Sequence, residues 1–141
     1  PDTVYRGAAA KEIAKDKIYY IKRGEILQTD DVKILCFGGA DDPTDDLFSD
    51  NVPNEKDFEN CLANLEKVGG SVDYIITHSP SGRTVRFLDL NSNATGATLD
   101  FLDILQSKVR YKKWYFGCGH KDKYISPKMQ AVYEEVYKLG E

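Results

Sequence analysis

The sequence predicts an α/β fold in which mixed β-sheets are flanked by helices, within a single domain over residues 1–141. Three short apolar runs, at residues 32–37, 72–77 and 113–116, have the length and the β-branched or aromatic content of buried strands. Stretches with apolar residues at helical spacing separate these runs. Such alternation of strands and helices is typical of layered α/β proteins.

The first part of the chain predicts strands joined by tight turns. Residues 17–21, KIYYI, form an aromatic and β-branched run that a glycine break follows. Residues 25–28 and 32–37 are joined by Thr-Asp-Asp, which favours a hairpin. The second strand of this hairpin is almost continuously apolar, which is typical of a strand covered on both faces, and it ends at Gly-Gly-Ala.

An acidic segment follows the hairpin, and residues 41–53 predict a long polar loop that contains two prolines. Its aspartates, Asp41, Asp42, Asp45 and Asp46, carry enough charge to attract a cation. Their spacing does not match an EF-hand loop, so a solvated acidic loop is the favoured interpretation.

Asn54 predicts the start of a helix, because its side chain can accept hydrogen bonds from the free N–H groups of the first turn. Glu55 and Asp57 suit the positive end of the helix dipole. One apolar stripe then recurs at helical spacing: Phe58, Cys61, Leu62, Leu65 and Val68. The Gly-Gly pair at residues 69–70 is a typical helix end.

The strand predicted at residues 72–77 leads directly into His78. Residues 79–97 contain many Gly, Ser and Asn residues and predict a connection without regular structure. Thr98 is the expected cap of a second helix. The apolar side of that helix comprises Leu99, Leu102, Leu105 and Val109.

The last strand of the three, residues 113–116, is rich in aromatic side chains, and Trp114, Tyr115 and Phe116 are expected in the core. It ends at the sequence Gly-Cys-Gly-His. Residues 123–125 and 129–137 then predict a closing pair of strands around Ser-Pro-Lys.

The composition excludes several classes of function. Nineteen Lys and Arg against 23 Asp and Glu give a net charge of −4, which does not indicate a nucleic-acid binder. No apolar run approaches the roughly 20 residues that cross a bilayer. The three cysteines do not form a disulfide framework, and Cys36 and Cys61 are expected as core thiols. We therefore expect a cytoplasmic protein without a membrane partner.

The chemistry-bearing candidates are the two histidines, His78 and His120, which both follow the ends of predicted strands. The crevice beyond the carboxyl ends of the strands is where α/β sheets usually bind ligands. Spacing alone leaves two interpretations open, a ligand site or two ordinary loop residues. Arg83 and Arg86 follow His78 and could bind a phosphate, although solvated surface charge is the commoner role of such residues.

Three segments, at residues 18–40, 64–80 and 112–139, together resemble the calcineurin-like metallophosphoesterases, especially small bacterial and phage members. The first contains IYYIKRGEI and ends at GGA. The second ends at THSP, which is similar to the family's Thr-His-x-Pro-like metal motif. The third contains FGCGH, which is similar to the Phe-Gly-His-x-His motif. The resemblance covers nearly all of this chain but only the later half to two-thirds of a whole, untruncated family member.

The resemblance implies a partial metallophosphoesterase-like α/β sandwich with a site for divalent metals such as Mn, Zn or Fe. It places His78 at a ligand of the second metal and His120 at a ligand of the first. Cys118 stands where the family has another histidine ligand, so a lost ligand is the favoured interpretation. A thiolate binds zinc but suits Mn or Mg poorly.

The family's Gly-Asp-x-His, Gly-Asp-x-x-Asp-Arg and Gly-Asn-His-Asp/Glu motifs have no match in the chain. They supply the bridging carboxylate of the two-metal site that activates water for phosphoester hydrolysis. Three hypotheses follow. The chain is part of a phosphohydrolase (hydrolase) and inactive alone, or it is a non-catalytic module that forms a homodimer or binds a protein partner, or it holds one zinc through Cys118, His120 and His78.

Overall fold

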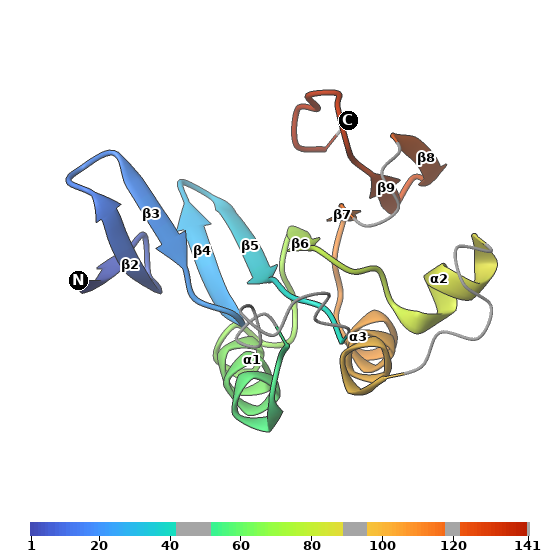
Figure 1. Cartoon of the computed structure of the whole chain (residues 1–141), viewed down its shortest axis with the longest axis horizontal. Coiled ribbons are helices and arrows are strands. Elements are labelled where there is room, and N and C mark those ends of the chain that lie inside the picture. The colour runs from blue at the N-terminus through green and yellow to red at the C-terminus, as the bar shows by residue number, and fades with distance from the viewer. Residues whose placement is uncertain (42–51, 89–95, 118–121, 141) are drawn as a thin grey trace.

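The computed structural model of the chain describes residues 1–41, 52–88, 96–117 and 122–140, and its strands form two sheets (Figure 1). The first is a three-stranded antiparallel sheet in the order β1-β2-β3. The second has six strands in the order β4-β5-β6-β7-β9-β8. The strands are β1 (Asp2–Tyr5), β2 (Ala8–Ala14), β3 (Ile18–Ile21), β4 (Glu25–Thr29), β5 (Val32–Phe37), β6 (Tyr74–Thr77), β7 (Lys113–Phe116), β8 (Lys123–Ser126) and β9 (Met129–Ala131). The helices are α1 (Glu55–Lys67), α2 (Gly82–Phe87) and α3 (Ala97–Lys108). The α/β class expected from the sequence is confirmed.

The centre of the large sheet is parallel and its outer strands are antiparallel. Strands β5, β6, β7 and β9 pair in parallel, whereas β4 and β8 pair antiparallel with β5 and β9. The order from β5 to β7 advances one way across the sheet, and connections between parallel strands are right-handed. Both crossover helices therefore lie on the same face, where Figure 1 shows α1 and α3 side by side.

The hydrophobic core lies between this face and the two helices. Leu35, Ile75, Trp114 and Met129 occupy one register row across β5, β6, β7 and β9, and all four are buried. The helices add Cys61, Leu65, Phe101, Leu102, Leu105 and Val109. Leu99 is buried as well, so the whole apolar side expected for the second helix is confirmed.

Helix α1 begins where the sequence predicts. The Asn54 side chain accepts from the Asp57 N–H at 3.1 Å, and the Asp57 carboxylate accepts from the Asn54 N–H at 2.9 Å. This reciprocal pair is a capping box, which satisfies two N–H groups that the helix cannot. The expected apolar stripe is wrong at Leu62. This residue is 44% exposed and lies at the edge of the buried face of α1.

Two helix expectations are wrong. Thr98 does not cap α3; Gly96 holds the cap position without a side-chain bond, and Thr98 is fully buried. The Asp41 carboxylate takes the capping role by accepting from the N–H groups of Thr98 at 2.7 Å and Leu99 at 3.1 Å. Helix α2 lies within the connection that was expected to be irregular, and Ser81 caps it by accepting from the Thr84 N–H.

Strand boundaries differ at both ends of the chain. Strands β1 and β2 escape the sequence analysis because the alanine-rich β2 has weak intrinsic strand preference, so its pairing with β1 and β3 decides its conformation. The final strand ends at Ala131 rather than at residue 137. The N–H groups of Tyr133, Glu134 and Glu135 donate to the Asp122 carboxylate instead of to a neighbouring strand.

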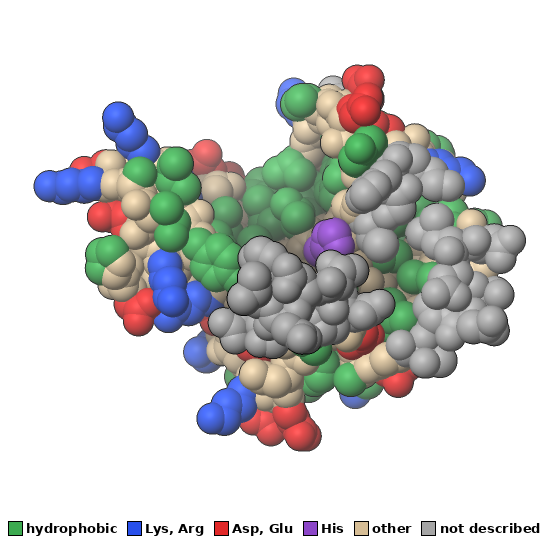
Figure 2. Space-filling view, viewed as in Figure 1, with side chains coloured by type: hydrophobic (Ala, Val, Ile, Leu, Met, Phe, Trp, Pro, Cys, Tyr) green, Lys and Arg blue, Asp and Glu red, His purple; other side chains and the backbone are tan. Residues whose placement is uncertain are grey.

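The sheet face opposite to α1 and α3 has no helix over it in the described parts of the chain. This open face carries Leu27, Ile34, Cys36, Tyr74, Ile76 and Tyr115, as the alternation along the strands requires. Ile76 is 42% exposed. The C-terminal segment contacts one end of the open face, where the Gly140 N–H donates to the Tyr115 hydroxyl at 2.8 Å. Figure 2 shows hydrophobic side chains in the hollow beside that segment.

The expectation that residues 32–37 are covered on both faces therefore holds only in part. Leu35 and Phe37 are buried under the helices, and Ile34 is buried on the open face, but Cys36 on the open face is only half-buried. Cys61 is the core thiol that the sequence predicts. Burial raises the pKa of Cys36 to about 11, and burial followed by the nearby Glu25 charge raises that of Cys61 to about 12. No helix within the described ranges has the length and apolar character needed to span a bilayer.

Candidate functional site

Three parallel strands end together at one edge of the large sheet. Phe37, Thr77 and Phe116 are the last residues of β5, β6 and β7, and they are paired in one register row. Gly38, His78 and Gly117 therefore follow at the same edge. This is the carboxyl edge of the sheet, where α/β proteins usually place their ligand sites.

The exits of β6 and β7 are joined by a hydrogen bond. The Gly117 N–H donates to the His78 carbonyl at 3.0 Å, which continues the strand pairing by one residue. The His78 side chain is exposed, and Figure 2 shows its imidazole (purple) on the surface next to hydrophobic side chains. Cys118 and His120, the other expected metal ligands, lie outside the described residues.

The turn that follows β6 is fixed by side-chain bonds on both sides of His78. The Thr77 hydroxyl donates to the Ser79 carbonyl at 2.6 Å and accepts from the Trp114 indole N–H at 2.8 Å. Ser81 donates to the Gln106 side chain of α3 at 2.5 Å. The chain on either side of His78 is thus tied to β7 and to α3, while the imidazole itself stays accessible.

The exit of β5 is held by the cap of α3. Gly39 has a φ of +98°, which turns the chain after β5 in a conformation that favours glycine. The segment then reaches the N-terminus of α3, where Asp41 accepts its two N–H bonds. Asp41 therefore neutralises a helix dipole rather than standing in a solvated acidic loop. Asp42, Asp45 and Asp46 lie outside the described residues.

The two arginines proposed to bind phosphate lie on α2. The Arg86 guanidinium is 3.5 Å from the Asp103 carboxylate, which compensates part of its charge. The Arg83 backbone N–H donates to the same carboxylate at 2.9 Å, and its side chain is exposed. Arg83 also lines a cavity of about 290 Å³, together with Thr84, Phe87, Gln106, Ile125, Ser126 and Met129. Phe87 is 78% exposed, which gives this cavity an apolar rim.

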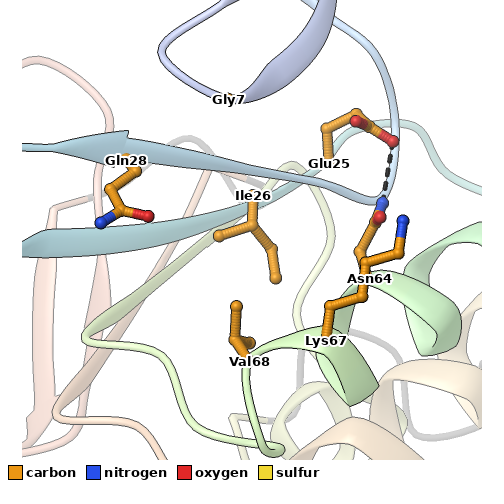
Figure 3. Close-up of a pocket in the computed structure, with 7 residues that line it drawn as sticks. All are labelled: Gly7, Glu25, Ile26, Gln28, Asn64, Lys67 and Val68. Atoms are coloured by element: carbon orange, nitrogen blue, oxygen red, sulfur yellow. Dashed lines mark hydrogen bonds between the residues drawn. The ribbon is translucent and has the colours of Figure 1, made fainter.

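A second cavity, of about 220 Å³, lies between β4 and α1 (Figure 3). Its one carboxylate, Glu25, points toward Asn64 and accepts from that amide at 2.8 Å. Glu25 also accepts from the Asn60 amide and the Ala9 N–H. Burial would raise the pKa of Glu25, but these hydrogen bonds outweigh it and lower the pKa. A carboxylate with three donors already in place serves to join the two sheets rather than to bind a ligand.

A metal ion at the carboxyl edge would require donors from more than one strand exit. Among residues 1–41, 52–88, 96–117 and 122–140, no three His, Cys, Asp or Glu side chains lie close enough together to hold a metal. His78 contributes one imidazole there. Neutral imidazole is a common zinc ligand and also suits other transition metals.

Sequence reasoning did not find two of the groups that shape this edge. The bond between Thr77 and Trp114 joins residues 37 positions apart, and that between Asp41 and Thr98 joins residues 57 apart. No local pattern encodes such pairs. No known family model matches the chain, and the searches of curated proteins and of solved structures returned no match either.

Proposed function

We propose that this chain is a metallophosphoesterase-family domain whose carboxyl edge contributes to a phosphoester-binding metal site. His78 and His120 are the proposed ligands of a divalent ion such as Zn, Mn or Fe, and Cys118 is a third donor only if the ion is zinc. Arg83 and Arg86 are the proposed phosphate-binding groups. The proposed setting is the cytoplasm.

One observation supports this proposal: the Gly117 N–H donates to the His78 carbonyl, so the ends of β6 and β7 lie next to each other at the carboxyl edge. Three peptide units separate Gly117 from His120, a reach of about 10 Å. His120 thus follows the end of β7 closely in the sequence, and its imidazole is the proposed partner of His78. Because the bridging-carboxylate motifs are not in this sequence, the chain alone is expected to hydrolyse phosphoesters very slowly.

Metal binding is the first test. Zn²⁺ and Mn²⁺ are titrated into the isotopically labelled chain, and the imidazole resonances of both histidines are followed by NMR. We expect both to respond to the same equivalent of Zn²⁺. His78→Ala and His120→Ala should each weaken binding by about tenfold or more, because loss of even a residue that only supports a ligand typically weakens metal affinity by about that factor. Lys108→Ala, an exposed change on α3, is the control. If neither ion changes the imidazole resonances of the wild-type chain, the proposal is contradicted.

A second candidate function, a non-catalytic binding module, is favoured by the open face. Parallel sheets are normally covered on both faces, whereas α1 and α3 cover only one. A homodimer or a protein partner that covers Ile76, Tyr74 and Cys36 would complete this arrangement.

Light scattering after size-exclusion chromatography tests this second candidate. We expect a concentration-dependent dimer, and Ile76→Lys should shift it to monomer because a charge cannot enter an apolar interface. Ile13→Lys, an exposed apolar residue on β2, is the matched control and should leave the dimer intact. If the wild-type chain stays monomeric at high concentration, the hypothesis that the open face forms a homodimer is wrong.

A further inference from the structure

The cavity of about 290 Å³ beside α2 has walls from three elements. Helix α2 contributes Arg83 and Phe87, α3 contributes Gln106, and the β8–β9 hairpin contributes Ile125 and Met129. Arg83 and Phe87 are four residues apart, so they lie on the same side of their helix. An apolar cavity of about 150 Å³ can hold benzene. The cavity beside α2 therefore has room for a ring and a charged group.

Hydrogen bonds fix the walls of this cavity relative to one another. The Thr84 hydroxyl donates to the Met129 sulfur at 3.4 Å, which joins α2 to β9. The Ser81 hydroxyl donates to the side-chain oxygen of Gln106 at 2.5 Å, which joins the start of α2 to α3. Thr84 and Met129 are only 4% and 5% exposed, so buried side chains form the inner wall. A site that is formed in advance loses less free energy in ordering when a ligand binds.

The polar groups of the cavity are donors, and none of its lining residues is Asp or Glu. The Arg83 side chain is exposed, and within the described ranges its guanidinium has no carboxylate partner, whereas that of Arg86 has Asp103. The oxygen of Gln106 is occupied by Ser81, which leaves the amide NH₂ as a donor without an acceptor among the described residues. One positive charge and one amide donor favour an anionic group.

The rest of the lining is apolar. Ile125 and Met129 come from the hairpin, and Phe87 at the end of α2 is 78% exposed although it is a large aromatic side chain. A ligand in the cavity would cover part of this ring and remove apolar surface from water. Binding sites for small molecules typically combine such apolar walls with a few placed polar groups. The lining thus suits a molecule with an apolar body and one anionic group.

We propose that the cavity between α2, α3 and the β8–β9 hairpin binds a small organic anion, a carboxylate or phosphate monoester with an apolar body. The anionic group lies at Arg83 and the Gln106 amide, and the body lies against Phe87, Ile125 and Met129. This inference goes beyond the proposed function, because the cavity needs no metal ion.

The single methionine of the chain, Met129, gives a direct test. Its ¹³C-labelled methyl group is followed by NMR, in the presence of EDTA, while phenyl phosphate or phenylacetate is added. We expect saturable shifts with a dissociation constant of about 1 mM or lower, the range that a ligand of about ten heavy atoms can reach. Phenol and inorganic phosphate, which each carry one half of the chemistry, should bind at least about tenfold more weakly. The tighter of the two anions identifies the preferred anionic group.

Two variants separate the contributions of charge and apolar surface. Arg83→Gln should weaken phenyl phosphate binding by about tenfold or more, since it removes a charge-assisted hydrogen bond. Phe87→Ala should weaken it severalfold. The matched controls are Arg110→Gln and Ile104→Ala, which make similar changes at exposed residues outside the cavity and should leave the affinity within about twofold of the wild type.

Two results would overturn the inference. If no probe shifts the Met129 methyl resonance, the cavity does not bind ligands of this class. If phenol binds as tightly as the two anions, or Arg83→Gln binds phenyl phosphate as tightly as the wild type, the cavity does not recognise an anionic group. Because EDTA removes divalent metal ions, neither result depends on whether the carboxyl edge binds one.

Discussion

At the scale of single residues, Glu25 shows how a charged group can hold two sheets together. Its carboxylate receives the Ala9 N–H of the small sheet at 2.9 Å and the amides of Asn60 and Asn64 of α1 at 2.7 and 2.8 Å. The residue itself belongs to β4 of the large sheet. Three elements thus share one carboxylate, so a change of this side chain affects the contacts between all three.

Glu25→Gln is therefore expected to destabilise the fold. The new NH₂ group would face amide donors and leave at least one of them without an acceptor, at a cost of about 1–2 kcal/mol in the free energy of unfolding. Urea denaturation followed by circular dichroism measures this change. Glu66→Gln makes the same chemical change at an exposed position of α1 and is the control. It should alter the free energy of unfolding by less than about 0.5 kcal/mol. If the two variants unfold with the same free energy, the hydrogen bonds of Glu25 do not stabilise the contact between the two sheets.

At the scale of elements, α3 depends on a cap supplied from a distant part of the chain. Gly96 at its cap position has no side chain, and its φ of +154° suits glycine. Asp41 supplies the missing oxygens to Thr98 and Leu99. A side chain at Gly96 would collide with the Asp41 carboxylate, so the glycine and the aspartate require each other.

Asp41→Ala is expected to weaken α3 by about 1 kcal/mol, since it removes the cap and the negative charge at the helix N-terminus. Thermal unfolding should show a melting temperature lower by a few degrees. Asp100→Ala removes a charge from the same turn but leaves the cap, and it should have less than half the effect. Gly96→Ala should resemble Asp41→Ala because it displaces the same carboxylate.

Helices α1 and α3 show which caps can be predicted from the sequence alone. The capping box of α1 uses residues three apart, Asn54 and Asp57, so a local pattern could reveal it. The cap of α3 comes from Asp41, which only the tertiary fold brings near, whereas the local pattern favours the hydroxyl of Thr98. The strand at Lys113–Phe116 was predicted to the residue because its aromatic run is buried along its whole length.

The candidate site follows the same rule. The position of His78 at a strand end was predicted, because the apolar run of β6 and the following Ser-Pro mark that end in the sequence. The pairing of its carbonyl with Gly117, and the Thr77 bond to Trp114, depend on β6 and β7 being neighbours. Strand order is a property of the whole chain, so these contacts could not be read locally.

At the scale of the whole molecule, several carboxylates couple the fold to pH. The pKa of Glu25 is lowered although burial opposes it, because hydrogen bonds favour the charged form. The pKa of Asp73 is lowered chiefly by the Lys33 N–H, with a further contribution from Lys112. In each case the folded chain holds the proton less tightly than the unfolded chain does.

Stability should therefore be fully present above the ordinary pKa values of 4.5 for Glu and 3.8 for Asp, and fall as the pH drops through the lower values of the folded state. Urea midpoints measured between about pH 7 and pH 3 should stay level at first and then decline. In Glu25→Gln the decline should be shallower, since one of the responsible groups no longer titrates. A decline of unchanged slope would mean that other groups control it.

The strand order of the large sheet also has a consequence for biosynthesis. From β4 to β7 each strand pairs with the one made just before it, so a chain emerging from the ribosome can add every new strand to an edge that already exists. The order then breaks, because β9 takes the place beside β7 and β8 lies outside it. β8 has no strand to join until β9 has been synthesised, so this edge of the sheet can assemble only after β9 has left the exit tunnel.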